Sequence, residues 1–102
     1  ADVEAAFAEP LGRLLGSDGT SLELIEAVKE AGKDVVNRAP TGEVRDVGRV
    51  IYYAAIARAH LLYGARITSH DWGVLATAFS RLAETEWLPP EVTCWFAEMQ
   101  KA

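Results

Sequence analysis

The chain is poor in cysteine, and Cys94 is the single one among its 102 residues. One cysteine cannot form a disulfide within the chain, and it cannot supply the paired thiolates of a cysteine-based zinc site. Nothing near Cys94 in the sequence offers the positioned base that a nucleophilic thiol needs. We therefore expect Cys94 to be a half-exposed bystander.

Long apolar runs are also missing. The main one, over residues 50–57, stops at Arg58 and is far shorter than the roughly 20 residues that a membrane span requires. No basic segment followed by an apolar stretch opens the chain, so no signal peptide is expected. These features predict a soluble, cytoplasmic protein that has no membrane partner.

Glycine and proline are sparse, with eight and four residues, while half of the chain is apolar and a quarter is charged. This composition excludes collagen-like repeats and argues against disorder. The length suits a single domain over residues 1–102. The formal net charge of −5 disfavours nucleic-acid binding, so no nucleic acid is expected as a partner.

Charge is distributed unevenly along the chain. Residues 38–66 hold five arginines against two acidic residues, whereas acidic residues outnumber basic ones on both sides of this segment. A basic element packed between acidic neighbours is the simplest interpretation, and a basic face kept free for an acidic partner is the alternative. Contact with nucleic acid is a third and weaker idea; it would use Arg38, Arg45, Arg49 and Arg66.

Motifs that carry catalysis or bind cofactors are absent. The sequence has no Gly-x-x-x-x-Gly-Lys loop, no Gly-x-Gly-x-x-Gly and no Gly-x-Ser-x-Gly. It also lacks the His-x-x-x-His and Glu-x-x-His spacings of helical metal sites. We accordingly expect no cofactor, no metal and no assignable catalytic residue, and an interaction role more than an enzymatic one.

Apolar periodicity predicts an all-α fold, a small four- to five-helix bundle with a central third helix. We expect the second helix to follow a capping box at Thr20 and to end at residues 39–42. A helix over 43–63 with Gly64 as its stop comes third, and a fourth is capped by Thr68 or Ser69. Pro90 suits the first position of the last helix.

The first helix is less regular. Phe7, Leu11, Leu14 and Leu15 share one helical face, but Pro10 lies between them and has no N–H to donate. We expect either two short helices that meet at Pro10 or a helix that begins near it.

The third helix carries an unusual polar face. At 100° per residue, its apolar residues cover one broad arc, and the opposite arc holds tyrosine, arginine and histidine, residue types common in binding hot spots. The alternative is that these side chains cover apolar neighbours and pair with the acidic second helix. We call this set the polar stripe: Arg45, Arg49, Tyr52, Tyr53, His60 and Tyr63.

Two charged residues lie on apolar arcs, Arg58 on the third helix and Glu86 on the fourth. A buried guanidinium needs a partner, so we expect these two to pair inside the bundle or at its rim. Alternatively they form a charged pocket with Arg66 and His70 at the junction of the third and fourth helices, which would bind a small anion or a substrate.

The last helix has an apolar stripe at helical spacing, made of Val92, Trp95, Phe96 and Met99. These residues complete the core of a small domain, or they dock on a second copy to form a homodimer. Taken together, the sequence favours a non-enzymatic helical interaction module with an unknown protein partner, such as an adaptor or an inhibitor or immunity-like domain. The alternative is a small-anion binder or enzyme that uses the junction pocket.

Overall fold

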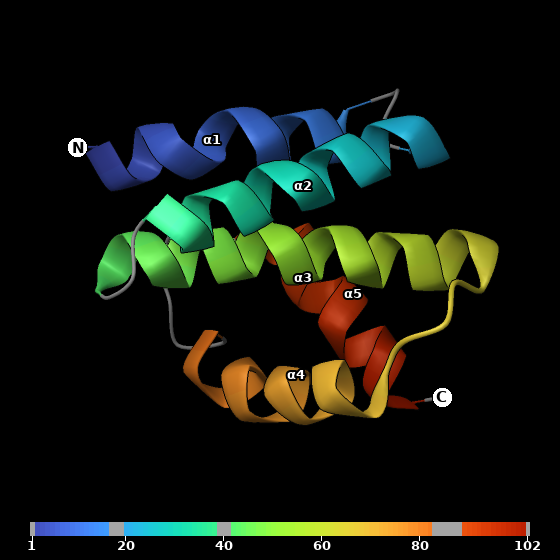
Figure 1. Cartoon of the computed structure of the whole chain (residues 1–102). Coiled ribbons are helices and arrows are strands. Elements are labelled where there is room, and N and C mark those ends of the chain that lie inside the picture. Colours follow the sequence, from blue (N-terminus) through green and yellow to red (C-terminus); the bar gives the residue numbers. More distant parts are fainter. Residues whose placement is uncertain (1, 17–19, 39–41, 83–88, 102) are drawn as a thin grey trace.

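In the computed structural model, the described backbone covers residues 2–16, 20–38, 42–82 and 89–101, and the described side chains exclude 2–8, 43, 76–82 and 100–101. Five helices account for nearly all of this part of the chain, which contains no strand, and they confirm the all-α bundle (Figure 1). They are α1 (Asp2–Leu15), α2 (Leu22–Arg38), α3 (Glu43–Tyr63), α4 (Ser69–Leu82) and α5 (Pro90–Lys101).

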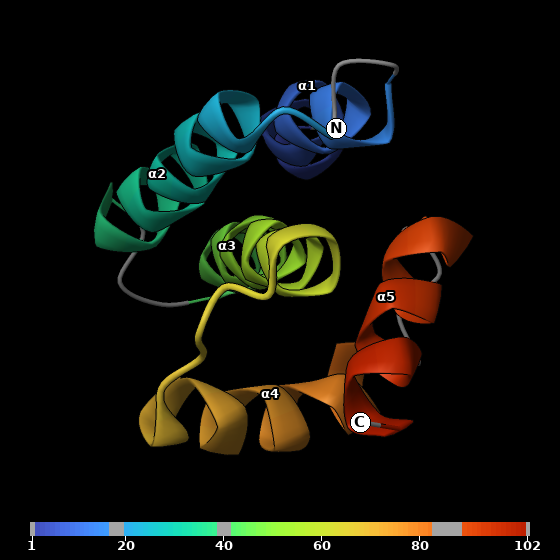
Figure 2. The same ribbon diagram turned by 90° about the vertical axis from the view of Figure 1, so that its right-hand side faces the viewer.

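The third helix is central, as predicted. Seen end-on, α3 has α1 and α2 on one side, α4 on the opposite side and α5 along its flank (Figure 2). Close backbone approach is most extensive between α2 and α3, and α1 and α5 also pack on α3. Each of these helices therefore covers a different part of the α3 surface.

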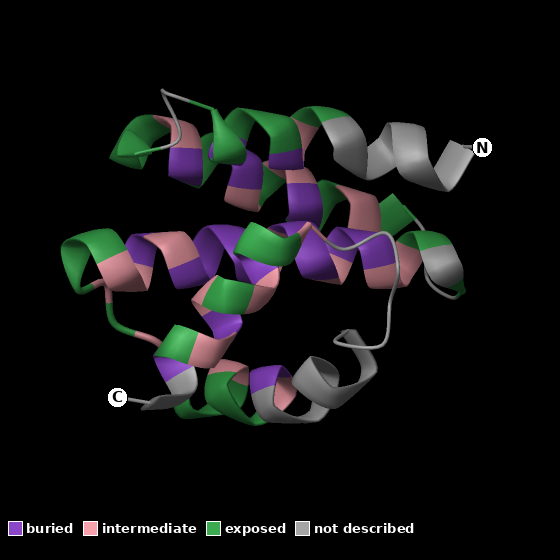
Figure 3. Cartoon of the chain, turned by 180° about the vertical axis from the view of Figure 1, so that it is seen from behind, coloured by how far each residue is buried: buried purple, intermediate pink, exposed green. Residues whose placement is uncertain are grey.

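The core is concentrated on α3 (Figure 3) and follows most of the predicted apolar faces, but it also includes Tyr53 of the polar stripe, and Val44 and Leu62 near the two ends of α3 stay exposed. Leu11 and Leu14 of α1 are buried, as are Ile25 and Val28 of α2. The apolar stripe of α5 is confirmed as core, because Val92, Phe96 and Met99 are at most 2% exposed and Trp95 packs against them. On α3 the buried apolar residues are Val47, Val50, Ile51, Tyr53, Ala54, Ala55, Ile56, Ala57 and Ala59.

Two buried glycines allow α2 and α3 to approach each other closely. A Cβ atom at Gly32 would lie 2.5 Å from the Tyr52 backbone nitrogen and 2.9 Å from the Gly48 carbonyl oxygen. A Cβ atom at Gly48 would lie 2.9 Å from the backbone nitrogen of Val36. The helices cross almost backbone to backbone at this point, which only a residue without a side chain permits.

Local signals at the helix ends place most boundaries. Gly64 adopts the left-handed conformation, with φ 67°, and donates to the His60 carbonyl. The Thr68 Oγ1 accepts from the Asp71 N–H at 3.1 Å, so the first of the two predicted caps of α4 is confirmed. Pro90 occupies the first position of α5, as predicted.

The predicted cap of α2 is wrong by one residue. The Leu24 N–H donates to the Ser21 Oγ at 3.4 Å, and the helix begins at Leu22, so Ser21 caps it instead of Thr20. Either hydroxyl suits this role locally. The Thr20 carbonyl is engaged elsewhere, because it accepts a hydrogen bond from the Tyr63 hydroxyl of α3.

The predicted break at Pro10 is also wrong, since α1 runs unbroken through it from Asp2 to Leu15. A proline inside a helix removes one backbone hydrogen bond and crowds the preceding turn. Burial of Leu11 and Leu14 just beyond it, with α2 and α3 packed alongside, offsets that cost.

Candidate functional site

The polar stripe runs along α3 and faces the side between α2 and α4. On this side, Tyr63 contacts Thr20, two residues before α2, whereas Tyr53 and His60 contact residues of α4. The stripe is therefore divided between residues that α4 covers and residues that stay accessible.

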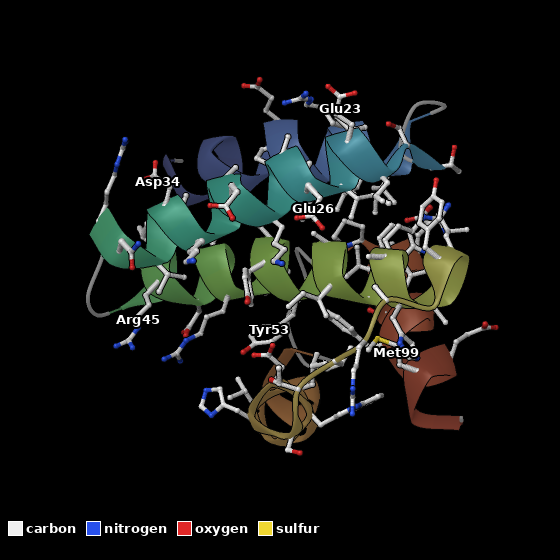
Figure 4. All side chains as sticks on the ribbon, turned by 45° about the vertical axis from the view of Figure 1, so that its right-hand side comes forward. Glu23, Glu26, Asp34, Arg45, Tyr53 and Met99 are labelled. Atoms are coloured by element: carbon white, nitrogen blue, oxygen red, sulfur yellow. The ribbon has the colours of Figure 1, made fainter. Side chains whose placement is uncertain are left out.

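Tyr53 belongs to the covered part. Its side chain lies between α3 and α4 (Figure 4), it is 6% exposed, and its hydroxyl donates to the Asp71 Oδ1 at 3.4 Å. Burial, followed by the negative charge of Asp71, raises the pKa of Tyr53 to about 12. A partner that binds the folded chain as it stands has no access to this ring.

Tyr52 stands next to it in edge-to-face contact, with ring centroids 5.0 Å apart. Its side chain is half-buried, and burial, then the charges of Asp71 and Glu30, raise its pKa. Because Asp71 belongs to α4 and Glu30 to α2, the Tyr52 hydroxyl lies in the field of both flanking helices.

His60 anchors the start of α4 to the end of α3. Its Nδ1 lies 2.9 Å from the Ala65 carbonyl oxygen, which can only accept, so Nδ1 carries the proton. The ring also meets Trp72 edge to face, with 5.9 Å between centroids. His60 is half-buried, so its contacts here are with the chain itself.

The remaining stripe residues are accessible. The Arg49 side chain is 38% exposed and lies 3.9 Å from an Asp46 oxygen, and Tyr63 is 52% exposed. Arg45 is half-buried along its stem, and its tip points away from the bundle (Figure 4). Together with half-buried Tyr52, these residues form the part of the stripe that a partner can reach.

Arg58, the charged residue on the apolar arc, has an aromatic neighbour. Its Cζ lies 4.8 Å from the ring centroid of Trp95 in α5, a cation–π geometry. Its Nε is buried and has no hydrogen-bond acceptor among the described residues. Glu86, the predicted partner, lies outside the described residues, so the predicted pair stays a prediction.

The other two residues of the alternative ligand site, Arg66 and His70, are exposed at the connection between α3 and α4. Arg58 instead stacks on α5, so the structure does not show Arg58 facing the same space as these two. In the described part of the chain, no three His, Cys, Asp or Glu side chains come together as a metal site. The Cys94 thiol is exposed.

One surface was missed by the sequence analysis. Leu15, Leu22, Leu62 and Tyr63 are exposed by 38%, 45%, 41% and 52%, and they lie where α1 ends, α2 begins and α3 ends. We call this surface the apolar end. By its angle Leu62 lies on the apolar arc of α3, and only its position in the last turn signals that neighbouring helices leave it uncovered.

The described helices include none with the combination of length and apolar character needed to cross a membrane. Comparisons with protein-family models, with curated proteins and with solved structures found no match to this chain.

Proposed function

We propose that the chain is a non-enzymatic helical interaction module that binds a protein partner through the accessible part of the polar stripe. The contact residues are Arg45, Arg49, Tyr52 and Tyr63. Tyr53 and His60, the other members, act from beneath by holding α4 against α3.

The observation that carries this proposal is the exposure of tyrosine and arginine along one face of the central helix, with Tyr63 52% and the Arg49 side chain 38% exposed. Tyrosine and arginine are enriched at protein interfaces because they combine a large contact area with directed polar groups. A helix packed on several sides also holds them in fixed positions, which lowers the entropy lost on binding.

The exposed single thiol, Cys94, suits a reducing compartment, so the proposal includes a cytoplasmic location. The alternative function, a small-anion binder at the α3–α4 junction, has less support, because Arg58 is already stacked on Trp95.

Affinity capture from a lysate of the source organism tests the proposal, with an Arg49→Ala/Tyr52→Phe double variant that removes a charge and a hydroxyl but keeps the Tyr52 ring packing. A matched control is Arg38→Ala, since Arg38 also pairs with an aspartate on its own helix, at 3.0 Å from Asp34, and lies off the stripe. We expect the wild type and the control to capture the same partner and the double variant to lose it.

Equal capture by all three proteins would refute the stripe as the contact surface. Equal thermal stability of the three proteins is a precondition, because Arg49 also interacts with Asp46 within α3. That pair is exposed and contributes little to stability, so we expect the condition to be met.

A further inference from the structure

The apolar end gathers most of the exposed large apolar side chains in the described part of the chain. Leu15, Leu22, Leu62 and Tyr63 lie here, whereas Val44 lies at the other end of α3 and Trp72 lies on α4. Figure 2 looks along α3 onto this end, where α1 ends and α2 begins beside it. The hydrogen bond from Tyr63 to the Thr20 carbonyl ties the end of α3 to the start of α2.

We infer that the apolar end is a self-association surface, and that its occupant is the apolar end of a second copy of this chain. The apolar end shares Tyr63 with the accessible part of the polar stripe, but the variants that test it change neither Tyr63 nor Arg49 nor Tyr52, so its failure is distinguishable from that of the proposed function. It also differs from the homodimer through the last helix that the sequence offered as an alternative, because the apolar face of α5 is buried in the core of its own chain.

The size of the surface supports a second copy. The exposed fractions of the four residues correspond to roughly 400 Å² per copy, the size of the largest apolar patch on a typical monomer, and such a patch often marks an interaction surface. About 60% of the area in such interfaces is apolar, so two facing patches with their rims bury roughly 1,300 Å², just above the lower bound for stable complexes. Two copies facing each other through this surface therefore bury enough area for a weak dimer.

The charges around the apolar end also suit a two-fold arrangement. Arg13 in the last turn of α1 and Arg66 after α3 are exposed, and so is Glu23 in the first turn of α2. A two-fold axis brings unlike parts of the same rim together, so one copy can place its acid opposite an arginine of the other. A rim of one sign would repel its own copy.

Sedimentation equilibrium over protein concentrations from about 1 µM to 1 mM tests the inference, because interfaces at the low end of the size range form weak complexes that a high protein concentration populates. The disrupting variants are Leu22→Glu and Leu62→Lys. Glutamate is favourable at the first turn of α2 and lysine at the last turn of α3, so both chains keep their fold while the apolar end becomes charged. We expect each variant to weaken the dimer by at least about tenfold.

Val44→Glu is the matched control, since Val44 is 38% exposed and lies in the first turn of α3, at the opposite end. The control should dimerise like the wild type. The inference is overturned if the wild type is monomeric throughout, which would leave the apolar end to an unlike partner. It is equally overturned if the wild type dimerises and both charged variants dimerise as strongly, or if Val44→Glu is as disruptive as they are.

Discussion

At the scale of single residues, Tyr53 shows how burial changes the role of a side chain. By type it is a good interface residue, yet it is 6% exposed and its hydroxyl is committed to Asp71. Its angle on α3 is 100° from that of Tyr52, which is enough to turn one ring under α4 and leave the other at the edge. Two tyrosines one position apart thus have different roles: Tyr53 is buried under α4, and Tyr52 stays partly accessible.

The raised pKa of Tyr53 makes the free energy of unfolding depend on pH in the alkaline range. In the unfolded chain a tyrosine ionises near its ordinary value of 10.0, but in the folded chain Tyr53 ionises near 12. Between these values the folded state binds more protons, so the free energy of unfolding falls as pH rises from 10.0 to 12. Below this window both states are protonated, and this contribution is fully present.

Urea unfolding at intervals from about pH 8 to pH 11 measures the effect. Tyr53→Phe is expected to make the alkaline fall smaller than in the wild type, with the raised pKa of Tyr52 accounting for part of what is left. The same substitution should cost about 1 kcal/mol at neutral pH for the lost hydrogen bond. If Tyr53→Phe and the wild type lose stability in parallel, Tyr53 does not ionise late.

At the scale of helices, the crossing of α2 and α3 rests on Gly32 and Gly48. Glycine inside a helix costs about 1 kcal/mol relative to alanine. The apolar spacing of α2, with Ile25 and Val28 facing the core, does not reveal from the sequence that Gly32 lies against the α3 backbone. The two glycines offset this cost because they let α2 and α3 pack at close range.

Gly32→Ala is expected to destabilise the chain by about 2–3 kcal/mol, because the added methyl group would meet backbone atoms that cannot move aside. Gly12→Ala is the matched control, since it also lies inside a helix but nothing stands within 4 Å of its added Cβ. That substitution should stabilise by about 0.5–1 kcal/mol. Chemical denaturation of both variants measures the two changes in the free energy of unfolding. A change of the same sign in both would contradict the close approach of α2 and α3 at Gly32.

At the scale of the whole molecule, stability is centred on α3, which is buried by helices on several sides. Native-state hydrogen exchange should therefore find the slowest amides between Val47 and Ala57, exchanging only through global unfolding. The amides at the start of α1 and the end of α5 should exchange faster, because helix ends fray. Slower exchange in α1 or α5 than in the middle of α3 would contradict a central role for α3.

The sequence by itself determined the five helices, most of their ends and the apolar faces of α2, α3 and α5. These depend on contacts within a few residues: a hydroxyl at a helix start, Gly64 at a helix stop, and a spacing of 3.6 residues per turn. Even there, Thr20 and Ser21 were locally equivalent, and Pro10 was misjudged because its cost is offset by packing from outside α1.

Only the tertiary structure decided which polar residues stay accessible. The angle of a side chain on α3 is known from its position, but whether α4 covers that angle depends on where α4 packs. Tyr53 is buried for this reason, and Arg58 meets Trp95 from a helix more than thirty residues away in the chain. The apolar end likewise exists because three helix ends meet there, a coincidence in space that no local pattern in the sequence encodes.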